Sequence, residues 1–253
     1  MYEKKERGLP LWKSATMDAI PGVWHAFTGR RGGAGAGAFN SFNLSVSVGD
    51  DPGSVSANRG RLADVAGVNP SLVRFQTQVH GGDVVQLDDP TGNPVRADGF
   101  VTARRGVPMM VGVADCVPIL LTDVAGTAVG AVHAGWRGVV AGIAERAVAS
   151  MRERYHVGPA TVVAAIGPCI GPAMFEVGDE VAAQFDSGFV VREQGKPHVD
   201  LSSAARRQLE DAGVLPANID NANICTMSHQ DVCFSHRGSG GHTGRMAGII
   251  VLT

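Results

Sequence analysis

Three residues of this chain have the side chains that bind a catalytic zinc ion. His80 lies in a Gln-Val-His-Gly run, Cys116 in an Ala-Asp-Cys run, and His133 begins a His-Ala-Gly-Trp-Arg-Gly run. Two imidazole nitrogens and one thiolate sulfur would leave the fourth tetrahedral position of zinc open for water or substrate, as in catalytic zinc sites. The three residues therefore predict a metal-dependent enzyme.

The spacing of these residues is compatible with such a site but does not establish it. They lie 36 and 17 residues apart, whereas structural zinc sites usually use paired ligands two to four residues apart. Apolar runs at 75–80, 109–116 and 127–133 each predict a strand that ends near a glycine, a proline or a turn. Strand ends of one sheet can converge on a metal. A single histidine or cysteine can equally be a structural residue of the core, and that interpretation stays open.

The strand and helix patterns place these residues in a mixed architecture. Further strands are predicted at 23–27, 161–166 and 248–252, and helices at 54–66, 137–154, 178–185 and 202–212, with Ser54 as the N-cap of the first helix. The helix at 137–154 would direct its free N–H groups toward His133, where a thiolate or phosphate would be favoured.

The glycine-rich segment at 28–38, with Arg30 and Arg31, predicts a loop; that it is a mobile loop with its two arginines near a substrate stays open. A dinucleotide fingerprint would need a helix directly afterwards, but residues 39–48 alternate with the period of a strand. A Rossmann fold is therefore rejected.

Several strands follow one another between residues 73 and 133 without a helix among them, which disfavours a doubly wound parallel sheet. We predict an α/β (α+β) fold, a layered sandwich of mixed sheets flanked by helices. No linker divides the 253 residues, so one domain is predicted over 1–253, with residues 1–20 as an N-terminal extension that could be flexible.

Charge and composition narrow the setting. The net charge of −2 gives no basic field for nucleic acid, and no stretch of 18 apolar residues predicts a membrane span. The N-terminus lacks a secretory signal, so we expect a cytoplasmic protein. The four cysteines (116, 169, 225 and 233) do not form a disulfide framework and are predicted to be thiols.

Ordered motifs along almost the whole chain resemble the YfiH family, whose members carry the names laccase-domain protein and polyphenol oxidase and are associated with purine nucleoside phosphorylase activity. Besides the three runs above, the matching blocks are Phe42-Asn43-Leu44, Asp50-Asp51-Pro52, Asn58-Arg59, Ala97-Asp98-Gly99, Gly167-Pro168-Cys169, Phe175-Glu176-Val177-Gly178, Cys225-Thr226 and Thr243-Gly244-Arg245.

The resemblance implies that His80, Cys116 and His133 bind zinc, and that the fold is similar to that of cysteine-dependent toxin deamidases. Three positions depart from the family pattern: Gly29 and Arg30 after Thr28, where a second threonine is common, Phe42, where leucine is usual, and His236, where an aromatic residue is common. These differences could alter substrate preference but leave the metal ligands unchanged.

Copper-dependent phenol oxidation, which the name laccase suggests, fits the sequence poorly. Multicopper oxidases use His-X-His pairs, and none of the eight histidines (25, 80, 133, 156, 198, 229, 236 and 242) is two residues from another. Copper bound at a lone His/Cys/His set would be adventitious, because one such ion cannot reduce dioxygen to water.

The function predicted from the resemblance is zinc-dependent phosphorolysis of adenosine, inosine and S-methyl-5′-thioadenosine, with adenosine deamination as a second activity. Its partners would be a purine nucleoside and phosphate. Candidate catalytic residues are Cys116, Asp115, which would transfer protons, and Arg59. Candidate substrate-binding residues are Asn43, Gln78, Arg137, Arg237 and Arg245, the arginines for phosphate. Each arginine could instead form a surface ion pair, Asn43 and Gln78 could cap turns, and Asp115 could orient a ligand.

Two other functions stay open. Cys116 could be a nucleophile with His133 as its base, in an amidase that edits peptidoglycan precursors. Alternatively, the zinc could be structural in a binding module without catalysis. The sequence leaves the choice between a monomer and a small homo-oligomer undecided.

Overall fold

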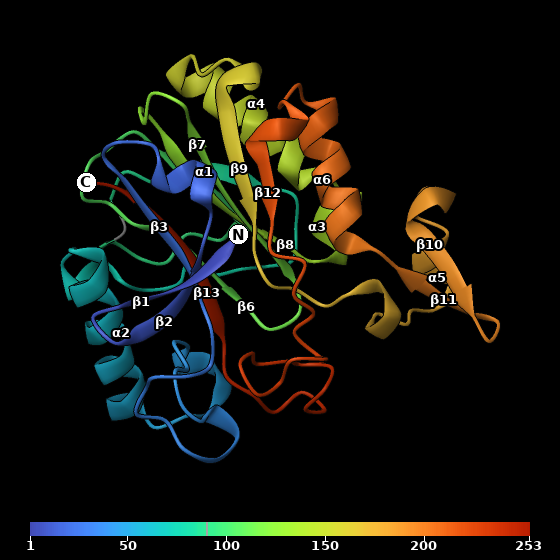
Figure 1. The fold of residues 1–253 in the computed structure, drawn as a ribbon, viewed down its shortest axis with the longest axis horizontal. Coiled ribbons are helices and arrows are strands. Elements are labelled where there is room, and N and C mark those ends of the chain that lie inside the picture. The colour runs from blue at the N-terminus through green and yellow to red at the C-terminus, as the bar shows by residue number, and fades with distance from the viewer. Residues whose placement is uncertain (90) are drawn as a thin grey trace.

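Two β-sheets stack face to face in a computed structural model of the chain, and helices cover both outer faces (Figure 1). The structure describes residues 1–89 and 91–253. From one side to the other the layers are helix, five-stranded sheet, six-stranded sheet and helices. The predicted layered mixed-sheet sandwich is confirmed.

The five-stranded sheet is antiparallel throughout and has the order β1-β2-β3-β13-β6. Its strands are β1 (Tyr2–Glu6), β2 (Leu9–Lys13), β3 (Val23–Thr28), β6 (Met109–Val113) and β13 (Met246–Leu252). Residues 1–20, which the sequence marks as an N-terminal extension, thus supply two strands of this sheet and the short helix α1 (Ala15–Asp18).

The six-stranded sheet is mixed, with the order β12-β9-β7-β8-β5-β4 and parallel pairs only at its two edges. Its strands are β4 (Val84–Gln86), β5 (Gly99–Thr102), β7 (Val117–Asp123), β8 (Val129–Ala134), β9 (Val162–Ile166) and β12 (Ile219–Asn221). The central strands β5, β7, β8 and β9 are buried along their whole length, as expected for strands covered on both faces.

Helices bury both outer faces. On the five-stranded sheet, Leu62 and Ala63 of α2 (Pro52–Ala66) pack with Met110 and Ile249. On the six-stranded sheet lie α3 (Trp136–Val140), α4 (Ile143–Tyr155) and α6 (Leu201–Asp211). The core between the sheets contains Phe27, Met109 and Ile250 of the five-stranded sheet. They pack against Phe100 and Leu120 of the six-stranded sheet.

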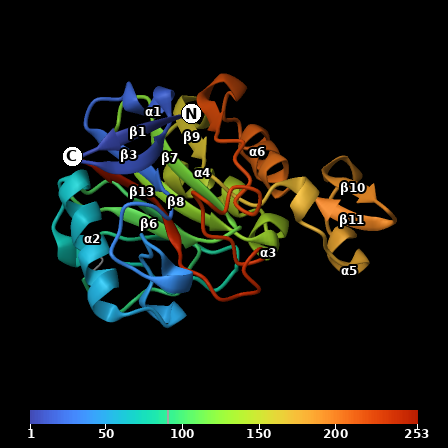
Figure 2. The same cartoon turned by 60° about the horizontal axis from the view of Figure 1, so that its bottom comes forward.

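One segment projects from the sandwich (Figures 1 and 2). It contains α5 (Asp179–Ala182) and the antiparallel hairpin of β10 (Val190–Glu193) and β11 (Lys196–Val199). The predicted helix at 178–185 is thus a single turn.

Four local predictions are wrong in detail. Residues 39–48 form no strand, because the Asn43 side chain bonds the backbone of Ser45 two residues on and that of the distant Arg245. Residues 75–80 form a loop with one isolated bridge at Thr77. The helix predicted at 137–154 is interrupted at Gly142, which adopts φ +74°. Asp51, not Ser54, caps α2, by accepting from the Ser54 N–H at 2.7 Å.

A buried ionic cluster ties the first two strands to the sheet. The Lys13 ammonium, 3 % exposed, lies 3.1 Å from Glu6 and 3.0 Å from Asp18. His25 beside it is fully buried, and its Nε2 accepts from the Ser14 N–H at 2.8 Å. Burial, together with the charge of Lys13, lowers the pKa of His25 to about 4. His25 is therefore neutral in the fold near neutral pH.

We expect His25 to make the protein less stable in mild acid. Its folded pKa lies below the unfolded value near 6.5, so the stabilisation is full above pH 6.5 and is lost as the pH falls toward 4. Between pH 7 and pH 5 the loss should be about 2 kcal/mol. Urea unfolding at pH 7 and pH 5 measures the change in unfolding free energy. The decrease between the two pH values should be smaller by this amount in His25→Gln than in the wild-type protein. Equal losses in both proteins would refute the assignment.

Candidate metal and substrate site

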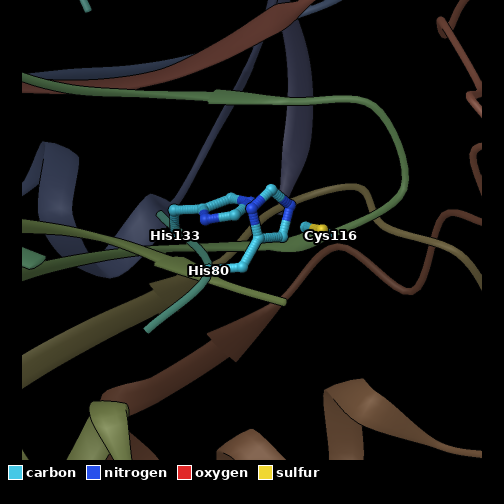
Figure 3. Close-up of side chains that lie close together, drawn as sticks. All are labelled: His80, Cys116 and His133. Carbon is cyan, nitrogen blue, oxygen red and sulfur yellow. The ribbon is translucent and has the colours of Figure 1, made fainter. Parts of the chain in front are cut away.

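Three segments bring His80, Cys116 and His133 together (Figure 3). His80 lies in the loop before β4, Cys116 directly precedes β7, and His133 is near the end of β8. Their ligand atoms all lie within 4.8 Å of one another, and the two imidazole rings meet edge to face with centroids 4.8 Å apart. His133 is buried, Cys116 partly buried and His80 exposed, so the cluster is open to solvent on one side.

The register of two neighbouring strands explains how Cys116 and His133 come together. Antiparallel pairing of β7 with β8 sets Val117 opposite Ala134 and Pro118 opposite His133. Cys116 is therefore one step beyond the paired end of β7, beside the end of β8. Asp115, with φ +95°, makes the sharp bend between β6 and β7 that brings the cysteine there.

Asp98 holds both histidines in place, a role that its sequence motif does not predict. Its fully buried carboxylate lies 2.8 Å from His133 Nδ1 and accepts backbone N–H bonds from Val79 (3.1 Å), His80 (2.9 Å) and Gly81 (2.8 Å). Engaging Nδ1 directs Nε2 of His133 toward the cluster, as carboxylate partners of metal-binding histidines do. The three N–H bonds fix the turn in which His80 adopts φ +59°.

Electrostatics favour a thiolate in this cluster. Burial alone would raise the pKa of Cys116, but the charge of His133 and hydrogen bonds from His133 and His80 lower it to about 6. Burial would lower the pKa of His133, but the charge of Cys116 and the bond to Asp98 raise it to about 9. Without metal, the pair is therefore a thiolate and an imidazolium at neutral pH. A thiolate is also the form of cysteine that binds metal.

Gly135 leaves the space that the cluster occupies. A Cβ at this position would lie 3.1 Å from the His80 ring and 3.3 Å from Cys116 Sγ. Metal–ligand distances tolerate shifts of only about 0.2 Å. A side chain here would therefore displace two ligands at once.

We expect Gly135→Ala to weaken metal binding on the order of tenfold, because ligand misplacement has effects of this size. Competition with a chromophoric chelator would measure the affinity. The matched control is Gly60→Ala on α2, where a Cβ meets nothing within 4 Å. Unchanged affinity in Gly135→Ala would show that the cluster does not hold the metal.

A groove of about 760 Å³ lies close to the cluster, although none of the three ligands lines it; we call it the aromatic groove. Trp136, Phe175, Val181 and Arg237 are among its lining residues. Trp136 follows Gly135 directly, and the Arg237 backbone N–H donates to the carboxylate of Asp115 at 2.6 Å, one residue before Cys116. The groove lining also includes Glu176, so the groove combines aromatic faces with charged groups. Small-molecule sites likewise combine apolar and aromatic walls with polar groups that fix orientation.

Three of the predicted arginines lie around this region. The Arg237 guanidinium lies over the Phe175 ring at 5.4 Å and donates to the Glu176 carbonyl at 2.9 Å. Arg137 is exposed and lies over the Trp136 ring at 4.2 Å. The Arg245 guanidinium donates to the carbonyls of Thr243 and Gly244 at 3.0 Å. Burial lowers the pKa of Arg245, while the charges of Cys116 and Asp115 partly oppose this.

The other predicted residues are occupied by internal contacts or lie elsewhere. Asn43 is fully buried and bonds Ser45, Asp50 and the Arg245 N–H. Gln78 pairs with both backbone groups of Gly112 in β6, at 2.8 and 2.7 Å.

Asp115 and Arg59 also differ from expectation. Both carboxylate oxygens of Asp115 accept hydrogen bonds, from the Thr226 hydroxyl and the Arg237 N–H, so Asp115 anchors the loops around the site. Arg59 lies on α2, donates to the Leu44 carbonyl and packs on Phe75. The structure does not bring it to the ligand cluster.

The fold and the cluster define a mixed α/β protein with a His-Cys-His group that can hold a metal ion. A family profile described as "Multi-copper polyphenol oxidoreductase laccase" matches residues 24–253. The chain belongs to this family, which is the YfiH family that its motifs resemble.

Relatives agree with this assignment over almost their whole length. A protein of Streptomyces coelicolor named purine nucleoside phosphorylase is 40% identical, with 93% of this chain and 98% of the relative covered. The protein of Shigella flexneri named purine nucleoside phosphorylase YfiH is 38% identical, covering 91% and 94%. The crystal structure of YlmD from Geobacillus stearothermophilus superposes with a TM-score of 0.88 at 31% identity, covering 99% and 98%.

Within the residues that the structure describes, no helix is both long enough and apolar enough to span a membrane.

Proposed function

We propose that this protein is a zinc-dependent purine nucleoside phosphorylase that acts on adenosine, inosine and S-methyl-5′-thioadenosine. The observation that carries the proposal is the His80/Cys116/His133 cluster close to the aromatic groove. The reaction class comes from the relatives, since those from Streptomyces coelicolor and Shigella flexneri are both named purine nucleoside phosphorylase.

The donor set fits zinc. Two imidazoles and one thiolate with one side open to solvent are the ligands of catalytic zinc sites, and Asp98 orients one of the imidazoles as such sites require. Zinc bound there would supply a Lewis acid that polarises an oxygen of the substrates. Among the described residues, this trio is the one group of three or more side chains placed to hold a metal ion, which is too few ligands for a multinuclear copper cluster.

The groove residues would bind and orient the two substrates. The purine can stack on the aromatic faces of Trp136 and Phe175, because every base presents a π-face. Arg237 donates one guanidinium N–H to the Glu176 carbonyl. Of its five N–H groups, others are left to bind phosphate. Held by Asp115 through its backbone, Arg237 would keep phosphate close to the ribose C1′, where the bond to the base breaks.

Adenosine deamination is a second reaction that we propose for this site. Water would replace the 6-amino group and release ammonia, and a metal at the cluster suits such chemistry. Asp115, the sequence-based candidate for proton transfer, already accepts two hydrogen bonds. We therefore propose that it keeps the groove in shape.

A product assay tests these proposals. Purified zinc-loaded protein is incubated with each nucleoside, with and without phosphate, and products are separated by chromatography. Phosphate-dependent release of free base and ribose 1-phosphate is the expected result, and inosine from adenosine without phosphate would report deamination. If zinc-loaded protein releases neither base nor inosine, the proposal is wrong.

One observation favours a second candidate, a cysteine amidase. In the metal-free protein the pKa values of Cys116 and His133, about 6 and about 9, are those of an activated thiolate–imidazolium pair. Metal content separates the candidates. Protein that is isolated without metal and rapidly alkylated at Cys116 would favour the amidase, whereas tightly bound zinc would protect the thiolate.

A further inference from the structure

A second groove, of about 700 Å³, lies beside the N-terminal half of α2 and the turn at Pro70–Leu72. We call it the arginine groove. Among its lining residues are Arg59, Arg74, Ser56, Ser71, Val46 and Val73. Helix α2 lies on the opposite side of the molecule from α3 in both views (Figures 1 and 2), and the arginine groove shares no lining residue with the aromatic groove.

The groove carries two positive charges without an acidic lining residue. Arg59 and Arg74 both line it, and burial together with the charge of Arg74 lowers the pKa of Arg59. Within residues 1–89 and 91–253 neither guanidinium forms an ion pair; the arginines that do are Arg31, Arg192, Arg206 and Arg207. Asp89 is exposed, and hydrogen bonds from Thr91, with smaller effects of the charges of Arg104 and Arg74, lower its pKa. Two like charges side by side are unfavourable, and a bound anion would offset that repulsion.

Both guanidiniums have spare hydrogen-bond donors. Arg59 uses its Nε on the Leu44 carbonyl at 2.8 Å, and its ring contact with Phe75 fixes the plane of the group. Arg74 donates from Nη2 to the Gly92 carbonyl, and its buried Nε has no partner among the described residues. Since each guanidinium has five N–H groups, most remain for a ligand. Asp51 already caps α2, so the arginines and not the helix supply the positive potential.

Apart from the two arginines, Ser56 and Ser71, the rest of the lining is apolar or glycine. Val46 is 61 % exposed at the rim, and Val73 is buried at the base. A ligand that matches this surface has an oxyanion and an apolar part. We propose that the arginine groove binds a small organic phosphate, with Arg59 and Arg74 on the phosphate oxygens and the organic part against Val46 and Val73. The proposal does not depend on phosphorolysis at the metal cluster.

The test is a titration with phenyl phosphate, followed by amide chemical shifts and by calorimetry. We expect shifts at Ser56, Gly60 and Ser71, and weaker binding of inorganic phosphate, which has no apolar part. Arg74→Gln should lower the affinity for phenyl phosphate on the order of tenfold or more. The matched control, Arg152→Gln, removes an exposed arginine of α4 and should leave the affinity unchanged.

A second variant covers the case in which Arg74→Gln does not fold. Ser56→Glu places a negative charge at an exposed lining position and should also weaken binding. Shifts confined to the aromatic groove, or an affinity that neither variant lowers, would overturn the proposal. Failure of the nucleoside assay would not, because Arg74 lies outside the proposed catalytic site.

Discussion

Cys116→Ala is expected to remove both tight metal binding and nucleoside phosphorolysis. The substitution deletes the only sulfur among three converging ligands and leaves two imidazoles, of which His80 is exposed. Because a catalytic zinc needs three protein ligands to stay bound while one position remains open, we expect activity to fall on the order of 10³-fold or more. Elemental analysis and kcat/KM for inosine measure the two effects together.

Cys225→Ser is the matched control for this variant. Cys225 is a half-buried thiol that accepts the Gly171 N–H at 3.2 Å, a bond that a serine hydroxyl can also accept. It should keep metal and activity. If Cys116→Ala retained wild-type phosphorolysis, the site would have to be sought elsewhere.

A third variant separates metal binding from nucleophilic catalysis. Cys116→Asp replaces the thiolate by an oxygen ligand that zinc accepts, so a zinc phosphorylase should keep part of its metal and a measurable activity. A cysteine amidase would lose all activity, because its nucleophile is gone. The Cys116→Asp substitution should therefore leave part of the activity on nucleosides but remove any amidase activity.

The ligand trio could be predicted because part of its geometry is local. Cys116 and His133 meet through the register of two antiparallel neighbours, β7 and β8, which are joined by a short turn. Strand prediction at 127–133 was sufficient to bring His133 near a strand end. The family motifs supplied the link to His80, which spacing alone did not give.

His80 itself shows where local patterns fail. The apolar run at 75–80 resembles a strand, yet Gln78 pairs with Gly112 through its side chain and Asp98 takes the N–H groups of the next three residues. These partners lie 17 or more residues away in the sequence. Periodicity cannot reveal them, because they compete with strand pairing only in the folded chain.

The role of Asp98 could not be predicted from the sequence for a related reason. An Ala-Asp-Gly run at the start of a strand is typical of a turn, and nothing nearby in the sequence indicates a buried carboxylate with four donors. The matching family block was the one available signal. Gly142 is a similar case, since an isolated glycine in a helical pattern does not by itself predict the left-handed break between α3 and α4.

Asp98→Asn is expected to weaken metal binding without removing any ligand. The carboxylate holds His133 through Nδ1 and fixes the His80 turn through three N–H bonds. These bonds, against the cost of burial, keep the pKa of Asp98 below its usual range, so the buried group is ionised. An amide has one accepting oxygen, and its NH₂ group would face an N–H donor. We expect zinc affinity and kcat/KM to fall about 10- to 100-fold.

A matched control variant, Asp123→Asn, shows whether the loss of zinc affinity in Asp98→Asn results only from lower stability. Asp123 is 5 % exposed and likewise accepts several backbone N–H bonds, from Ala125, Thr127 and Ala128, at the turn between β7 and β8 away from the cluster. Asp98→Asn and Asp123→Asn should each cost about 2 to 4 kcal/mol of unfolding free energy, because charged hydrogen bonds are lost. Only Asp98→Asn should lower zinc affinity. Equal zinc affinities for the two variants would mean that Asp98 supports the fold and does not position the ligands.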